Sequence, residues 1–142
     1  MSAPDQPSPL RTPLLLWGPV ALQMVLIFIA SSIPNLTELP GGISDKSGHG
    51  IGYALLGAVL LRALAGGRLR GVTWGRAAVA ILLAVAYGAS DEFHQSFVPG
   101  RTPDVFDVAA DGVGAAIAVA AGGAARAWGI LKFPSSRGGP HA

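Results

Sequence analysis

The sequence predicts an all-α membrane protein, a bundle of four transmembrane helices. Of its 142 residues, 51% are hydrophobic and 13% are charged, whereas soluble domains carry about 25% charged residues. The mean hydropathy is +0.50, and the apolar residues are gathered into long runs separated by short segments rich in Pro, Gly and charge. The length suits a single domain, but the polar residues are too few to cover a soluble one.

The composition also excludes several kinds of site. Cysteine is absent, which excludes disulfides, thiolate metal sites and a cysteine nucleophile. The net charge of +2 and the pI near 9.5 would suit a nucleic-acid partner. The basic residues, however, lie at the ends of the apolar runs, so we expect no nucleic-acid ligand.

The first apolar run, residues 14–33, carries no formal charge. Its length of about 20 residues is enough to cross a hydrocarbon core of roughly 30 Å. Residues 1–12 are rich in Pro and Ser and are predicted to be a disordered tail. A cleaved signal peptide is the alternative, because Arg11 precedes the run and residues 30–32 are small. The run is longer than the roughly 7–15 residues of a signal-peptide core, which favours a retained helix.

Two more helices are expected at about residues 47–65 and 72–90. Residues 34–44 contain two Pro and two Gly, which is typical of a connecting segment. Residues 66–76 form a short basic loop between the second and third helices.

The fourth helix follows a Pro-Gly turn at residues 99–100. Pro103 lies where the first turn of a helix accepts proline, and the helix is expected to run to about Trp128. The membrane domain is therefore predicted over residues 13–133, and the Pro-, Ser- and Gly-rich residues 134–142 are predicted to be a second disordered tail.

The charged residues predict how the bundle is oriented. Eight of the ten basic residues fall in the N-terminal tail, the middle loop or the C-terminal end, which share one face in a four-span topology: Arg11, Arg62, Arg68, Arg70, Arg76, Arg126, Lys132 and Arg137. The positive-inside rule makes that face, and both termini, cytoplasmic. Six of the eight acids lie toward the opposite face: Asp45, Asp91, Glu92, Asp104, Asp107 and Asp111.

Polar residues at helical spacing predict one pocket at the extracytoplasmic face. Three stripes repeat every three or four residues: Asp45, His49 and Tyr53; Tyr87, Asp91 and Gln95; Asp104, Asp107 and Asp111. At 1.5 Å per residue, Asp111 lies roughly 12 Å along the fourth helix, within the hydrocarbon depth. Carboxylates there should face the bundle interior or a water-filled cavity, so we expect the stripes to converge.

Small residues mark a second face of the fourth helix. They recur at four-residue intervals: Ala110, Gly114, Ala118 and Gly122. Such spacing allows close approach of two helix backbones in a membrane. A chance consequence of the Ala- and Gly-rich composition is the alternative.

The combination of these motifs resembles the VanZ-like family of bacterial membrane proteins over about residues 15–125. The resemblance is carried by Asp45-Lys46 with His49 and Tyr53, Asp91-Glu92-x-His94-Gln95, Val98-Pro99-Gly100-Arg101, Asp104, and Asp107 with Asp111-x-x-Gly114. It implies a multi-pass protein of the bacterial cytoplasmic membrane. The family is named for a protein that gives low-level resistance to the glycopeptide teicoplanin. The resemblance therefore also implies a contribution to teicoplanin tolerance.

The predicted pocket offers groups for catalysis and for binding. The candidate catalytic residues are His49, Asp91, Glu92, His94, Asp107 and Asp111. The candidate ligand-binding residues are Asp45, Lys46, Tyr53, Gln95, Arg101 and Asp104. The cofactor stays open, and a divalent cation would neutralise the acids, with four candidate ligands: His49, Asp91, His94 and Asp107. Carboxylates suit Mg²⁺ or Ca²⁺, and histidine also admits Zn²⁺ or Mn²⁺.

Several of these residues have a structural alternative. Arg101 would also hold the turn between the third and fourth helices by pairing with Asp91 or Asp104. Asp45 and Lys46 would also suit ordinary charges at the lipid headgroups. His49 and Tyr53 would also serve as interhelical hydrogen-bonding groups.

Three functional classes follow from the sequence. One is an enzyme that acts on an outer-leaflet envelope lipid or lipid-linked precursor, and another is a protein that binds such a lipid without turnover. The third, a small ion- or proton-coupled transporter, is less favoured because residues 80–86 and 115–123 are apolar or glycine and offer no polar path. Membrane lipids are the expected partners, and the sequence leaves the oligomeric state open.

Overall fold

The predicted four-helix bundle is confirmed. The computed structural model describes residues 11–34, 38–39 and 43–132. Its helices are α1 (Arg11–Ser31), α2 (Asp45–Leu64), α3 (Trp74–Gln95) and α4 (Val105–Lys132). Residues 11 and 12, assigned to the tail from the sequence, begin α1. The rest of the two predicted tails, residues 1–10 and 134–142, lies outside the described residues.

Three of the described helices are long and apolar enough to cross a membrane. These segments are Pro13–Ser31, Ser47–Leu64 and Val105–Trp128. α3 is not among them, because Arg76 near its start and five polar residues among its last six shorten its apolar stretch. It nevertheless contacts α1, α2 and α4, so that the four helices form one membrane-protein bundle.

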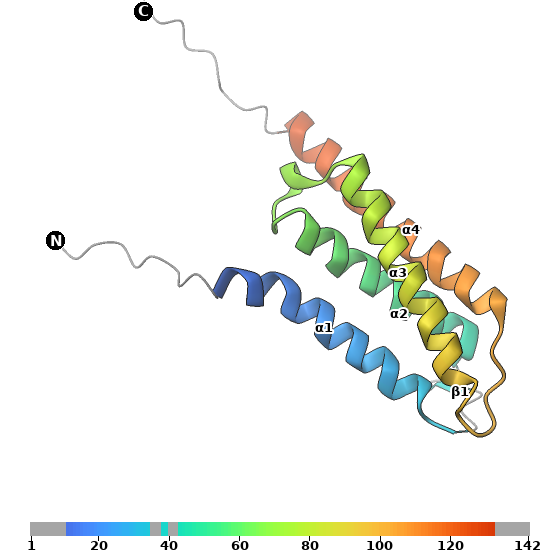
Figure 1. Cartoon of the computed structure of the whole chain (residues 1–142). Coiled ribbons are helices and arrows are strands. Elements are labelled where there is room, and N and C mark those ends of the chain that lie inside the picture. Colours follow the sequence, from blue (N-terminus) through green and yellow to red (C-terminus); the bar gives the residue numbers. More distant parts are fainter. Residues whose placement is uncertain (1–10, 35–37, 40–42, 133–142) are drawn as a thin grey trace, which may run out of the picture.

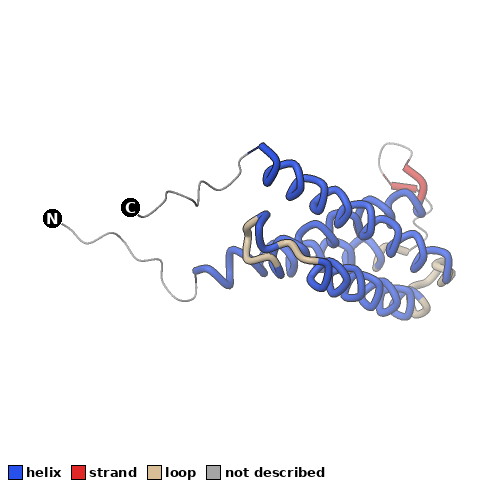
Figure 2. Tube along the Cα trace, turned by 90° about the horizontal axis from the view of Figure 1, so that it is seen from above, coloured by secondary structure: helices blue, strands red, loops and turns tan. Residues whose placement is uncertain are grey.

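The helices lie side by side with α2 in contact with the other three (Figure 1). The start of α1, the end of α4 and the α2–α3 connection, which contains the short helix η1 (Leu69–Gly71), lie at one end. The α3–α4 turn lies at the other end, together with a two-stranded hairpin (Figure 2). We call these the basic end and the acidic end, after the side chains that the sequence assigns to them.

The connection after α1 holds a small element that the sequence did not indicate. Strands β1 (Glu38–Leu39) and β2 (Ile43–Ser44) pair antiparallel, with Glu38 opposite Ser44. The pair leads directly into α2, which begins at the next residue. It therefore fixes where α2 starts at the acidic end.

The most extensive helix contact is between α2 and α4, and glycines make it close. A Cβ on Gly57 would lie 2.8 Å from the Cα of Ala115. A Cβ on Gly114 would collide with the backbone carbonyl of Gly50, and one on Gly122 would lie 2.8 Å from Leu61 Cδ2. The small-residue face predicted on the fourth helix thus packs against α2.

Beneath the acidic end, the bundle interior is apolar. The most deeply buried apolar residues come from α2, α3 and α4: Tyr53, Leu56, Ala80, Ala84 and Ala115.

At the basic end, Arg62 Nη1 donates to the carbonyl of Leu15 at 3.0 Å. That bond joins the end of α2 to the start of α1.

The start of α4 differs from the expected one. Pro103 does not lie in the helix, which begins at Val105 after the non-helical residues 101–104. Asp104 caps it instead, because its Oδ1 accepts from the Phe106 N–H at 2.8 Å and satisfies a donor that the helix leaves unpaired. The predicted turn at residues 99–100 is present, with Gly100 at a φ of 77°, a conformation that favours glycine.

Candidate functional site

Polar side chains are buried together at the acidic end. Among the described residues, the buried polar ones are Ser31, His49, Asp91, Glu92, Gln95, Asp107 and Asp111, and we call them the polar cluster. They come from the last residue of α1, the start of α2, the end of α3 and the start of α4. The structure thus brings together residues from all three stripes seen in the sequence.

His49 and Asp111 form the centre of the cluster. His49 Nδ1 lies 3.2 Å from Asp111 Oδ1, and the Asp111 side chain is 0% exposed. On the other side of the ring, Gln95 Nε2 lies 3.4 Å from His49 Nε2. An amide nitrogen only donates, so in this arrangement Nε2 accepts and Nδ1 carries the proton that is donated to Asp111.

A glycine on α3 makes room for the Asp111 carboxylate. A Cβ on Gly88 would lie 2.6 Å from Asp111 Oδ2, which is too close for any real contact. Gly88 is itself buried. Its missing side chain is therefore what allows a carboxylate from α4 to lie flat against α3.

Asp91 connects the cluster to α1. Ser31 Oγ donates to Asp91 Oδ2 at 2.7 Å, and Gln95 Nε2 donates to the same oxygen at 3.3 Å. Both bonds are buried. The first bond holds the last residue of α1 against the last turns of α3, and the second lies within α3 and fixes the Asp91 carboxylate.

Glu92 connects the end of α3 to the start of α4. Its Oε2 accepts from the Asp104 N–H at 2.7 Å, and its Oε1 lies 3.5 Å from Gln95 Nε2. The Asp104 side chain also caps α4. Asp104 is therefore held by its backbone to α3 and by its side chain to the first turn of α4. This arrangement fixes where Asp107 lies, one turn further along α4.

Three of these residues are placed to share one ion. Within the described part of the chain, ligand atoms of His49, Glu92 and Asp107 lie within 4.8 Å of one another. The sequence offers His49 and Asp107 as candidate metal ligands, together with Asp91 and His94. The geometry groups Glu92 with the first two.

Some polar atoms of the site are buried without a hydrogen-bond partner among the described residues. They are the Tyr53 hydroxyl, Asp91 Oδ1 and Asp111 Oδ2. Tyr53 is 1% exposed, and its ring stacks on that of His49 with centroids 6.1 Å apart. The cluster thus carries more acceptors than its own donors satisfy.

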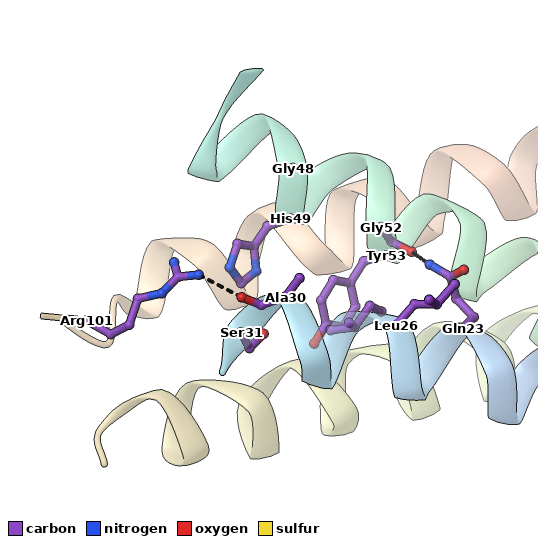
Figure 3. Close-up of a pocket in the computed structure, with 10 residues that line it drawn as sticks. Gln23, Leu26, Ala30, Ser31, Gly48, His49, Gly52, Tyr53 and Arg101 are labelled. Carbon is purple, nitrogen blue, oxygen red and sulfur yellow. Dashed lines mark hydrogen bonds between the residues drawn. The ribbon is translucent and has the colours of Figure 1, made fainter. Parts of the chain in front are cut away.

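A cavity of about 160 Å³ lies beside the cluster, between α1 and α2 (Figure 3). Ser31, His49 and Arg101 line one end of it, and Leu26 and Ile27 of α1 line its length. Gln23 closes the far part by donating from Nε2 to the Gly52 carbonyl at 3.1 Å (Figure 3). The cavity is polar at one end and apolar along its wall.

A family model described as VanZ/LLP1 matches residues 43–125. The chain belongs to the VanZ/LLP1 family. The match confirms the resemblance seen in the motifs, and it contains the whole polar cluster except Ser31. Neither a curated protein nor a solved structure matches the chain significantly.

In this VanZ/LLP1 protein, Arg101 and His94 contact α1, which lies outside the matched segment. Arg101 Nη2 donates to the Ala30 carbonyl at 3.1 Å and Nε to the Ile33 carbonyl at 3.3 Å, so that its positive charge lies at the helix C-terminus. His94 Nε2 lies 3.0 Å from Ser32 Oγ, and its ring stacks on Phe28 with centroids 4.4 Å apart.

Two expected members of the VanZ/LLP1 site, Asp45 and Lys46, begin α2, and their side chains lie outside the described ones. Two other residues of the site were not selected from the sequence. Ser31 was considered only as part of a cleavage site, although a serine closing an apolar helix is a signal for a polar contact. Gly88 gave no signal, because glycine is frequent throughout this chain.

Proposed function

We propose that this VanZ/LLP1 protein lies in the bacterial cytoplasmic membrane and binds the headgroup of an envelope lipid or lipid-linked precursor in its pocket at the acidic end. The observation that carries the proposal is the cavity between α1 and α2. Its polar end adjoins the polar cluster, and its α1 wall is apolar. An amphiphile has the same division between headgroup and chain.

The charges near the cavity favour an anionic headgroup at its mouth. Arg101 lines the polar end, and a guanidinium suits a phosphate or pyrophosphate group. The acids of the polar cluster are buried and are not among the described residues that line the cavity. A phosphate held by Arg101 would lie in the same cavity as His49, which also lines its polar end.

Action on the bound lipid, beyond binding, would use the polar cluster. His49 is held in one tautomer by Asp111 and Gln95, so that Nε2 is the ring nitrogen that carries the lone pair. Asp107 and Glu92 lie next to it. Sequestration or modification of a lipid-linked precursor would be the route by which such a protein contributes to teicoplanin tolerance.

The orientation of the bundle supports an extracytoplasmic pocket. Arg62, Arg68 and Arg76 lie at the basic end, around the α2–α3 connection, which the positive-inside rule assigns to the cytoplasm. Packing also favours a binding site over a conduction path. Ala80, Ala84 and Ala115, which are all 0% exposed, fill the interior beneath the cluster.

Cavity-filling variants test the proposal. Ala30 lines the cavity, so Ala30→Leu should reduce binding of a polyprenyl phosphate and of phosphatidylglycerol by at least about tenfold in native mass spectrometry. Ala21→Leu is the matched control, because Ala21 lies on an exposed face of the same helix. Gly52→Ala is a milder second variant, since its Cβ would meet Ile27 Cγ1 at an ordinary 3.7 Å.

Two results would contradict the proposal. One is equal binding of both lipids by the wild type, Ala30→Leu and Ala21→Leu. The other is the absence of stoichiometric lipid from a folded wild-type protein. Incubation of the bound lipids with wild type and His49→Gln then separates turnover from binding, because only turnover yields a product that the variant fails to form.

A further inference from the structure

We propose that the polar cluster holds one divalent transition-metal cation, with His49, Glu92 and Asp107 as its ligands and Asp111 as the residue that positions His49. The ligand atoms of these three residues lie within 4.8 Å of one another. They come from α2, α3 and α4, so that one ion would join the three helices that pack most closely. The site adjoins the cavity of the proposed function.

Buried oxygens without donors are the second observation that indicates a cation. Asp91 Oδ1 and Asp111 Oδ2 have no hydrogen-bond partner among the described residues, and Asp91 and Asp111 are 3% and 0% exposed. A buried polar atom without a partner is costly, and a charged one more so. A cation in the centre of the cluster would compensate both carboxylates.

The formal charges of the cluster favour a doubly charged ion. The buried polar residues that the structure describes include four acids: Asp91, Glu92, Asp107 and Asp111. A neutral histidine and two carboxylate ligands carry a charge of −2 together, which a divalent cation cancels.

The geometry of His49 is that of a metal ligand with its supporting carboxylate. Its Nδ1 faces Asp111 Oδ1 at 3.2 Å, which leaves Nε2 as the ligand atom. Metal-binding histidines commonly donate their other ring N–H to a carboxylate, which fixes the tautomer and the ring orientation. The contact from Gln95 to Nε2 is long, at 3.4 Å, so that a metal would replace a weak hydrogen bond.

The donor set selects among divalent cations. Mg²⁺ and Ca²⁺ prefer oxygen ligands throughout, whereas one imidazole with two carboxylates suits Zn²⁺ or Mn²⁺. We therefore infer Zn²⁺ or Mn²⁺, with the positions not filled by these residues open to water or to the bound headgroup. An ion there would add positive charge next to the cavity end where Arg101 lies.

Metal binding is measured on the full chain in detergent, without added lipid, after removal of metal by a chelator. Titration with Zn²⁺ and with Mn²⁺, followed by calorimetry and by elemental analysis, should give about one ion per chain. Asp107→Asn and Glu92→Gln should each weaken binding at least about tenfold. Ser90→Ala is the control, because Ser90 lies on an exposed face of α3 close to the cluster and its hydroxyl donates to the Tyr87 carbonyl.

The positioning role of Asp111 is tested with Co²⁺, whose absorption spectrum reports ligand geometry. Asp111→Ala should weaken binding by about 10–100-fold and alter the spectrum of the bound Co²⁺. Asp111→Asn, which keeps an oxygen acceptor for the Nδ1–H, should restore most of the affinity. A solely structural role would leave the spectrum unchanged in both variants.

Absence of a stoichiometric ion from the folded wild-type protein would overturn the inference, as would equal affinities of the wild type, Asp107→Asn and Glu92→Gln. Circular dichroism shows whether each variant is folded. If Asp107→Asn does not fold, the affinity of Glu92→Gln is compared with that of the wild type instead. Lipid binding by the metal-free protein separates the two proposals. If it persists, the lipid-binding function stands even where the metal site fails.

Discussion

His49 Nδ1 lies 3.2 Å from Asp111 Oδ1, and this buried contact joins α2 to α4 across 62 positions of the chain. It lies directly above the place where the two helices pack most closely, at Gly50 and Gly114. The close packing therefore sets the distance between the histidine and the carboxylate. A residue that spreads the two helices should also disturb the site.

The His49–Asp111 contact should contribute to stability as well as to the site. Asp111→Ala leaves the buried Nδ1–H without its acceptor, so we expect the free energy of unfolding to fall by about 1–3 kcal/mol. Asp111→Asn retains an acceptor and should lose less. Thermal unfolding of both variants in detergent, followed by circular dichroism, checks this order. Equal losses would show that the hydrogen bond to His49 is not the source of the effect.

Gly88 should tolerate no side chain. Its Cβ would lie 2.6 Å from Asp111 Oδ2, so Gly88→Ala should displace the carboxylate and lower the free energy of unfolding by about 1–3 kcal/mol, as overpacking does. Gly75→Ala is the control on the same helix, because nothing lies within 4 Å of its Cβ. A Gly88→Ala protein as stable as the Gly75→Ala protein would contradict this reading.

Because α2 packs closely against α4, alanine should be tolerated at some glycines of α4 and not at others. Gly114→Ala places a methyl group against the Gly50 carbonyl and should destabilise the bundle by about 1–3 kcal/mol. Gly123→Ala should be neutral, since nothing lies within 4 Å of its Cβ. Urea or detergent-induced unfolding of the pair measures the difference. If both changes were neutral, the two helices would not be in rigid contact.

Arg101 should hold the end of α1 in place. Its guanidinium donates to the carbonyls of Ala30 and Ile33, so Arg101→Gln should increase amide hydrogen exchange over residues 28–34. Arg70→Gln, in the exposed connection at the opposite end, serves as the control. Unchanged exchange at the end of α1 in Arg101→Gln would show that these bonds do not restrain it.

The predicted orientation is testable because the chain contains no cysteine. Thr102→Cys lies in the exposed α3–α4 connection, and Arg70→Cys lies in the exposed α2–α3 connection. In intact cells, a membrane-impermeant maleimide should label the first and not the second. The reverse pattern would place the pocket on the cytoplasmic side and remove the case for an outer-leaflet lipid.

The sequence by itself determined the number of helices, their approximate bounds and, for α2, α3 and α4, the face that each presents inward. These properties depend on local periodicity, and a run of about 20 apolar residues has few alternatives to a membrane helix. The stripes through His49, Asp91 and Asp107 could therefore be assigned to the bundle interior. The family could be recognised because its motifs are local in the sequence, lying in α2, α3 and α4 and in the turn between α3 and α4.

Only the tertiary structure decided which inward-facing groups meet. That depends on the rotation and axial offset of each helix, which are set by contacts between distant residues such as Gly57 with Ala115. These contacts pair Asp111 with His49, group Glu92 with Asp107 and bring Ser31 of α1 against Asp91. Periodicity determines the face of a helix on which a residue lies, and close packing between helices determines its partner.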